Sequence, residues 1–139
     1  MKVFLYYIGK QKDLHANAIA EEFVKRASHY APMQMLEIKA EKADLAAKHP
    51  TANRIYLDPG GRAMESGEFA QLFSRAEMAG QDLVFLVGGH DGLPAAWRGD
   101  AHLLLSLSKM TFPHELARAM VAEQIYRAWA ILRGHPYTR

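Results

Sequence analysis

The stretch Leu83-Val-Phe-Leu-Val-Gly-Gly-His-Asp-Gly92 decides the fold of this 139-residue chain. Its first five residues are all apolar, which is typical of a strand buried on both faces. Its next five include three glycines, which predict a turn. A second apolar run at residues 102–108 (HLLLSLS) follows, and a long helix is expected after it.

Capping residues mark both ends of that helix. Thr111 is the expected N-cap, with Pro113 in the first turn, where its missing N–H costs nothing. Gly134 predicts a left-handed C-cap, and Pro136 prevents continuation. Apolar residues recur at helical spacing in two rows, namely Ala117, Val121, Ile125, Ala128 and Leu132, and Leu116, Met120 and Ile131. This arc is wider than a one-sided helix needs, so we expect cover from the sheet and from a second source such as a partner subunit.

The preceding residues alternate between strand and helix patterns. Strands are expected at residues 2–8, 33–38 and 54–57, and helices at residues 13–30, capped by Asp13, and 67–78, capped by Ser66. Residues 40–48 are weakly helical, and residues 58–62 (DPGGR) read as a turn. The alternation predicts a single α/β domain over residues 1–139, with a mostly parallel sheet and helices on both faces. Ligands of such sheets bind beyond the carboxyl ends of the strands, where residues 57–61, 88–92 and 107–112 fall.

Composition excludes several classes of protein. The chain has no cysteine, which rules out disulfides and thiolate chemistry and suits the cytoplasm. No apolar run is long enough to span a membrane. The formal net charge is only +2, so contact with nucleic acid must rely on local clusters rather than on bulk charge. The seven histidines show no metal-ligand spacing, so no metal site is expected.

Each candidate for chemistry has a structural alternative. The glycines of residues 88–92 either allow close approach of a flat ligand or only form a tight turn, and the turn is favoured. Asp58 and Asp91 are candidate paired carboxylates, although turn aspartates usually bond their own backbone. His114, in the first turn of the last helix, either contacts a substrate or satisfies backbone. The tail carries Tyr137 and Arg139, residue types that stack on a base and hold a phosphate, on what is by default a loose end.

Four longer stretches of the sequence form distinctive motifs. They are Leu86-Val-Gly-Gly-His-Asp-Gly-Leu93, Leu105-Ser-Leu-Ser-Lys-Met-Thr-Phe-Pro-His-Glu-Leu116, Glu123-Gln-Ile-Tyr-Arg-Ala-Trp129 and His135-Pro-Tyr137. Together these stretches resemble the RlmH family of ribosomal RNA methyltransferases. The likeness extends to Ile8-Gly9-Lys10, Phe23-Val-Lys-Arg26 and Leu57-Asp58, and so covers essentially the whole chain.

The resemblance implies the SPOUT fold, an α/β sheet whose C-terminal segment is threaded through a deep trefoil knot, and a homodimer. It also implies S-adenosylmethionine (AdoMet) as methyl donor and no metal. The residues that match the family's AdoMet-binding loops are Leu57, Gly88, Gly89, Leu107, Ser108, Lys109, Met110, Thr111 and Phe112.

The implied reaction is methylation of N3 of a pseudouridine in large-subunit (23S) ribosomal RNA, on the assembled ribosome. A nearby cation would lower the pKa of the weakly acidic N3–H, so catalysis by positioning and electrostatics is expected. The expected RNA-side groups are His114, Arg118, Tyr137 and Arg139, with Glu115 or Asp91 as weaker candidates for the base.

The tail departs from the family at one position. Where the family usually has Tyr-His followed by a basic residue, this chain has Tyr137-Thr138-Arg139. Three hypotheses therefore stay open. The chain is an active methyltransferase, a catalytically impaired relative that binds ribosomes and keeps the AdoMet-binding fold, or, if the resemblance is set aside, a flavodoxin-like nucleotide-binding module.

Overall fold

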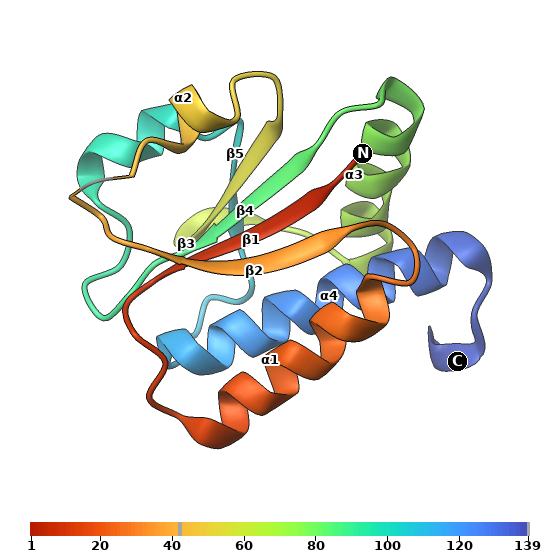
Figure 1. Cartoon of the computed structure of the whole chain (residues 1–139), viewed down its shortest axis with the longest axis horizontal. Coiled ribbons are helices and arrows are strands. Elements are labelled where there is room, and N and C mark those ends of the chain that lie inside the picture. Colours follow the sequence, from red (N-terminus) through yellow and green to blue (C-terminus); the bar gives the residue numbers. More distant parts are fainter. Residues whose placement is uncertain (42, 139) are drawn as a thin grey trace.

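The computed structural model describes residues 1–41 and 43–138. Its described strands form one parallel five-stranded sheet in the order β2-β1-β4-β3-β5 (Figure 1). The strands are β1 (Val3–Ile8), β2 (Met33–Ile38), β3 (Asn53–Ala63), β4 (Leu83–Val87) and β5 (Leu103–Ser106). The helices are α1 (Leu14–Ala27), α2 (Leu45–Lys48), α3 (Ser66–Ala79) and α4 (His114–Arg133), with short 3₁₀ helices η1 (Ala95–Asp100) and η2 (Pro136–Thr138).

Helices cover both faces of the sheet, so the predicted α/β class is confirmed. On one face, α1, α3 and α4 pack over the larger apolar core, while α2 and η1 lie over a smaller core on the other face (Figure 1). Strand β4 contributes side chains to both cores. Phe85 points into the larger core, and its neighbours Val84 and Leu86 point into the smaller one. Two-sided burial explains why this strand is apolar at every position.

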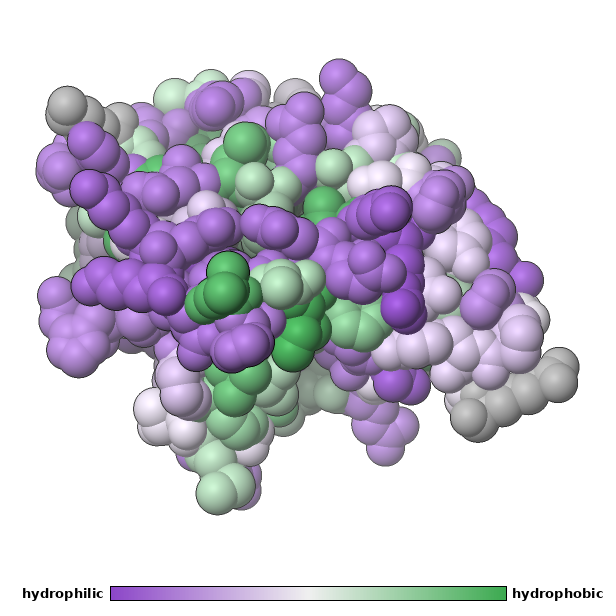
Figure 2. Space-filling model, turned by 60° about the horizontal axis from the view of Figure 1, so that its bottom comes forward, coloured by the Kyte–Doolittle hydropathy of each residue, from purple (hydrophilic) through white to green (hydrophobic). Residues whose placement is uncertain are grey.

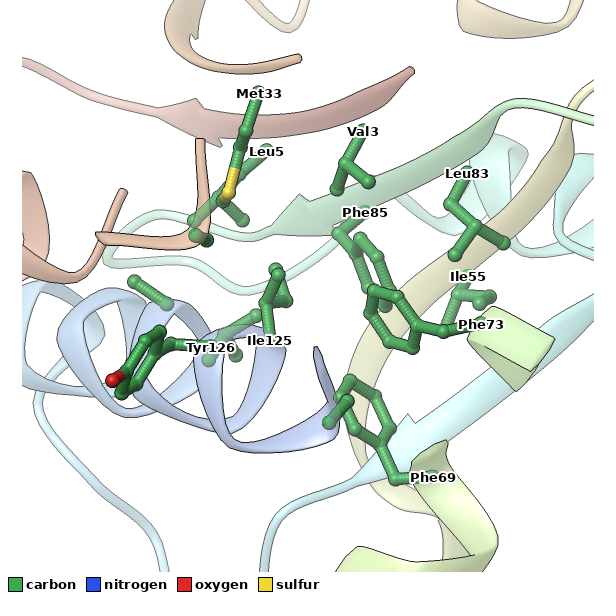
Figure 3. Packing of buried hydrophobic residues seen from close by; sticks show 14 of the residues in the cluster. Val3, Leu5, Met33, Ile55, Phe69, Phe73, Leu83, Phe85, Ile125 and Tyr126 are labelled. Carbon is green, nitrogen blue, oxygen red and sulfur yellow. The ribbon is translucent and has the colours of Figure 1, made fainter. Parts of the chain in front are cut away.

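Aromatic rings fill the space between α3, α4 and the sheet. Phe73 of α3 lies nearly parallel to Phe85 of β4 at a centroid distance of 5.8 Å (Figure 3). Trp129 of α4, which is fully buried, meets the edge of Phe73 at 5.3 Å. Contacts with α1, α3 and the sheet therefore cover most of the wide apolar arc of α4, whereas Leu116 in the same arc stays exposed.

Two of the expected helix caps are confirmed and two are wrong. Asp13 caps α1 by accepting a hydrogen bond from the Ala16 N–H, and Gly134 ends α4 at a φ of 67°. The helix predicted to run to residue 30 ends at Ala27. Helix α3 is capped by Glu65, which forms a capping box with Glu68, and not by Ser66. The N-cap position of α4 is Pro113, not Thr111, because the chain stays extended through residue 113.

Strand β3 does not end at residue 57 as predicted. It passes through Asp58-Pro-Gly-Gly61 with a shift in register and pairs again with β5 at Arg62. The expected turn is thus an irregularity inside a strand, comparable with a β-bulge. Gly61 is required there, since a Cβ atom would lie 2.5 Å from the Leu104 carbonyl oxygen. No helix in the described part of the chain is long and apolar enough to cross a membrane.

Candidate functional site

The carboxyl ends of β3, β4 and β5 and the N-terminus of α4 enclose a cavity of about 570 Å³. This volume lies within the range of small-molecule sites, about 300–1,000 Å³. The walls come from residues 57–59 and 87–93, from Arg98 of η1, and from residues of the segment 105–117. The three strand-end segments picked out in the sequence therefore share one site, as the parallel-sheet rule predicts.

Most residues of the expected cofactor set line this cavity. They are Leu57, Gly88, Gly89, Leu107, Ser108, Met110, Thr111 and Phe112. Lys109 is exposed, and it is not among the residues that line the cavity. The loop that carries it is held by two local hydrogen bonds, from the Ser106 hydroxyl to the Ser108 carbonyl and from the Met110 N–H to the Ser108 hydroxyl.

Close packing of the chain against itself accounts for the glycines after β4. A Cβ atom on Gly88 would lie 2.6 Å from the carbonyl carbon of Gly92, and one on Gly89 would lie 3.0 Å from the Ile8 carbonyl oxygen. Gly92 has a φ of 75°, which favours glycine. The favoured interpretation of a tight turn is therefore supported, and the same turn presents bare backbone to the cavity.

The two aspartates of the site have different surroundings. Asp58 is buried, forms an ion pair with Arg98 at 2.8 Å, and accepts a hydrogen bond from the Gly60 N–H at 3.1 Å. Asp91 lies exposed on the glycine turn. Asp58 is thus paired with a cation and not with a second carboxylate. Sequence reasoning missed Arg98, because it lies between two strands with no motif around it.

His114 is the first residue of α4 and lines the cavity. Free N–H groups and the positive end of the helix dipole gather at such a position, which favours oxygen atoms of partial negative charge. Among the described residues, no three His, Asp, Glu or Cys side chains are arranged to hold a metal ion.

Glu115 fastens the start of α4 to the start of α1. Its carboxylate accepts hydrogen bonds from the Lys12 N–H at 2.6 Å, from the Asp13 N–H at 3.0 Å and from the Asn17 side chain at 3.0 Å. The Lys12 bond is the largest of the effects that lower the pKa of Glu115 to about 2. A carboxylate with so low a pKa is a weak base, which argues against Glu115 as the proton acceptor.

Arg118 is fully buried, which differs from the predicted RNA-facing position. Its guanidinium lies 3.7 Å from the centroid of the Tyr7 ring and donates a hydrogen bond to the Asn17 side-chain oxygen at 2.7 Å. Burial lowers the pKa of Arg118. The fully buried Arg118 side chain therefore connects α4 to β1 and α1 in this structure.

The tail folds back onto the middle and C-terminal half of α4. The Tyr137 hydroxyl donates a hydrogen bond to Glu123 at 2.9 Å, the ring meets Tyr126 at 4.7 Å, and Arg127 lies over it at 5.1 Å. The three contact residues follow His114 by nine to thirteen residues along α4, which corresponds to about 14–20 Å along the helix axis. A single chain therefore does not bring Tyr137 and His114 together. Arg139 lies outside the described residues.

Comparisons with known proteins agree over the length of the chain. The profile of the family described as "Predicted SPOUT methyltransferase" matches residues 1–138. The chain is 64% identical to the ribosomal RNA large subunit methyltransferase H of Solibacter usitatus, with 100% of both chains covered. It is 37% identical to the protein of the same name from Thioalkalivibrio sulfidiphilus, over 100% of this chain and 99% of the relative.

Solved structures share the fold at low sequence identity. A probable methylase family protein from Haemophilus influenzae superposes with a TM-score of 0.62 at 11% identity, covering 98% of this chain and 68% of that one. The SpoU methyltransferase AviRb from Streptomyces viridochromogenes, solved with AdoMet, gives a TM-score of 0.52 at 12% identity, covering 94% and 61%. These likenesses support the expected SPOUT class of α/β fold.

Proposed function

The chain belongs to the RlmH family of SPOUT methyltransferases, and from this premise we propose that it methylates N3 of a pseudouridine in large-subunit ribosomal RNA with AdoMet as methyl donor. The observation that carries the proposal is the single cavity beyond β3, β4 and β5. Its lining includes all but one of the residues expected to bind AdoMet from the resemblance.

The lining suits AdoMet in size and in charge. Leu57, Leu105 and Leu107 supply apolar walls, and the glycine turn supplies backbone groups that a flat adenosine can approach. Two carboxylates, Asp58 and Asp91, and one guanidinium leave one net negative charge when histidine is counted as neutral. AdoMet carries one net positive charge and, when bound, supplies an electrophilic methyl group on a sulfonium. The three loops at residues 57, 88–89 and 107–112 would hold it.

Within this proposal, the residues of the chain position the target base and stabilise the charge that develops on it. His114 lies at the cavity wall, where a ring nitrogen would hydrogen-bond the edge of the target base. The N-terminus of α4 would stabilise negative charge that develops on that base as N3 loses its proton. Arg118 and Glu115 keep this helix end in place through α1 and β1.

A homodimer completes the proposed site. Tyr137 packs on the middle and C-terminal half of its own α4, so in this proposal a second chain presents Tyr137 to the cavity. Arg139 keeps its proposed RNA-side role from the family resemblance. The face formed by α1 and α4 shows apolar side chains among polar ones (Figure 2). Leu14, Ile19 and Leu116 are the large apolar side chains of these two helices that are exposed. We place the proposed dimer contact on this face, and the proposed action in the cytoplasm, on the assembled ribosome.

Thr138 supports the alternative of an impaired relative that binds ribosomes without methylating them. The experiment that separates the two is methyl transfer from labelled AdoMet to whole ribosomes that lack the modification, with isolated large subunits as a control. Incorporation into ribosomal RNA is expected. Binding of AdoMet without incorporation, and activity gained by Thr138→His, would favour the impaired relative.

A further inference from the structure

One ion pair in the cavity wall entered the function proposed above only through its contribution to the net charge. Arg98 of η1 contacts Asp58 of β3 through one terminal nitrogen, Nη2, at 2.8 Å from Oδ1. The Asp58 side chain is only 9% exposed, whereas 48% of the Arg98 side chain remains exposed. The pair therefore has a fixed, buried carboxylate and an accessible guanidinium, both at the cavity.

The hydrogen bonds of Asp58 fix the orientation of Arg98. One carboxylate oxygen contacts Arg98, and the other accepts the Gly60 N–H at 3.1 Å. Among the described residues, Asp58 is the partner recorded for this guanidinium, which has five N–H donors in a planar fork. Donors thus remain for a second carboxylate, which a guanidinium binds through two parallel hydrogen bonds.

The charges around the cavity show which ligand group belongs at Arg98. Among the described lining residues, Arg98 is the one with a fixed positive charge, while Asp58 and Asp91 are acidic. Consider a ligand that carries cationic groups and one carboxylate. Its carboxylate would lie at the free donors of the Arg98 guanidinium and away from Asp91, because like charges repel.

We infer that Arg98 binds the α-carboxylate of the methionine part of AdoMet and that Asp58 holds Arg98 in position for it. The inference rests on the proposed function and adds a subsite to it. Arg98 is a ligand-binding residue in this account, and Asp58 is a positioning residue.

The test is a cycle of four dissociation constants measured by calorimetry. The wild type and Arg98→Gln are each titrated with AdoMet and with decarboxylated AdoMet, which lacks only the carboxylate. The substitution should weaken AdoMet binding about 10-fold to 100-fold, the worth of a charge-assisted hydrogen-bonded pair. Binding of decarboxylated AdoMet should hardly change. Arg98→Lys should fall between the two, because it keeps the charge without the fork.

Two further variants complete the design. Asp58→Asn should reduce, but not abolish, the preference for AdoMet over decarboxylated AdoMet. The substitution loosens the Arg98 guanidinium but leaves it in place. Arg62→Gln is the matched control, because Arg62 lies on the same strand, pairs with Glu68 at 3.1 Å and is not among the lining residues. It should leave all dissociation constants unchanged.

Other outcomes overturn the inference in distinguishable ways. Equal weakening of both ligands by Arg98→Gln would mean that the ion pair only fastens η1 to β3. Unchanged binding of both would mean that Arg98 does not touch the ligand. In either case the proposed function stands. Failure of the wild type to bind AdoMet at all would remove the proposed function together with this subsite.

Discussion

The side chains at the start of α4 divide into two groups by their spacing along the helix. His114 and Ala117 line the cavity, whereas Glu115 and Arg118 point to α1 and β1. Each pair is separated by three residues and so shares one side of the helix. The reaction implied by the family resemblance grouped His114 and Arg118 as RNA-side groups. Only the packing of α4 against α1 separates their roles.

The hydrogen bonds by which Glu115 joins α4 to the start of α1 should make the stability of the fold depend on pH. The pKa of this group is about 2 in the folded chain and 4.5 in an ordinary environment. A lowered folded pKa means that the stabilisation is fully present above pH 4.5 and is lost as the pH falls from 4.5 towards 2. Glu115→Gln should therefore have a lower melting temperature than the wild type at pH 6, and this difference should shrink as the pH falls below 4.5.

The matched control for this experiment is Glu22→Gln, which alters an exposed ion pair with Arg26. Such pairs contribute little, about 0–1 kcal/mol, so its melting curve should follow the wild type at every pH. A Glu115→Gln curve parallel to wild type from pH 6 to pH 3 would show that the carboxylate is not a clamp.

At the scale of elements, the sequence predicts the sheet better than the ends of its helices. Strands at residues 33–38 and 83–87 lie where their β-branched and apolar residues indicate. Serine is the commoner N-cap, so the sequence predicts Ser66 as the cap of α3. Glu65 occupies that position instead, because Glu65 and Glu68 each bond the backbone of the other in a capping box. The continuation of β3 through Asp58-Pro-Gly-Gly61 was unpredictable locally, since it depends on pairing with β5.

That pairing makes Gly61 a sensitive position in the fold. Gly61→Ala would drive a methyl group into the backbone of β5 at Leu104, so we expect a loss of about 1–3 kcal/mol in the free energy of unfolding. Gly67→Ala is the control, because a Cβ there meets nothing within 4 Å and alanine suits a helix. Urea denaturation of both variants checks the prediction, and equal stabilities would contradict the close approach of Gly61 in β3 to the backbone of β5.

At the scale of the whole molecule, the sequence predicts where the cavity lies, but it does not predict that Tyr137 of the tail lies away from the cavity. The rule for parallel sheets brings residues 57, 88–89 and 107–112 together. Tyr137 was expected among the RNA-side groups together with His114, yet it packs on the middle and C-terminal half of α4. Its location depends on how the tail folds back on Glu123 and Arg127, which no local pattern reveals. The knot and the dimer remain predictions from the family resemblance.

If a second chain supplies the tail, two inactive variants should rescue each other. His114→Ala lacks a cavity residue and Tyr137→Phe lacks a tail hydroxyl, so each alone should methylate ribosomes poorly. After mixing and exchange of subunits, one site of the mixed dimer contains both intact parts, and partial activity should return. Activity no higher than that of the separate variants would indicate that each chain works alone.

The measurement that tests the central claim most directly is identification of the methylated nucleoside. Ribosomal RNA from the labelled reaction is digested to nucleosides, separated and compared by mass spectrometry with 3-methylpseudouridine and other methylated standards. The account predicts label in 3-methylpseudouridine from a single position of large-subunit RNA. Label in any other nucleoside, or spread over many positions, would contradict it.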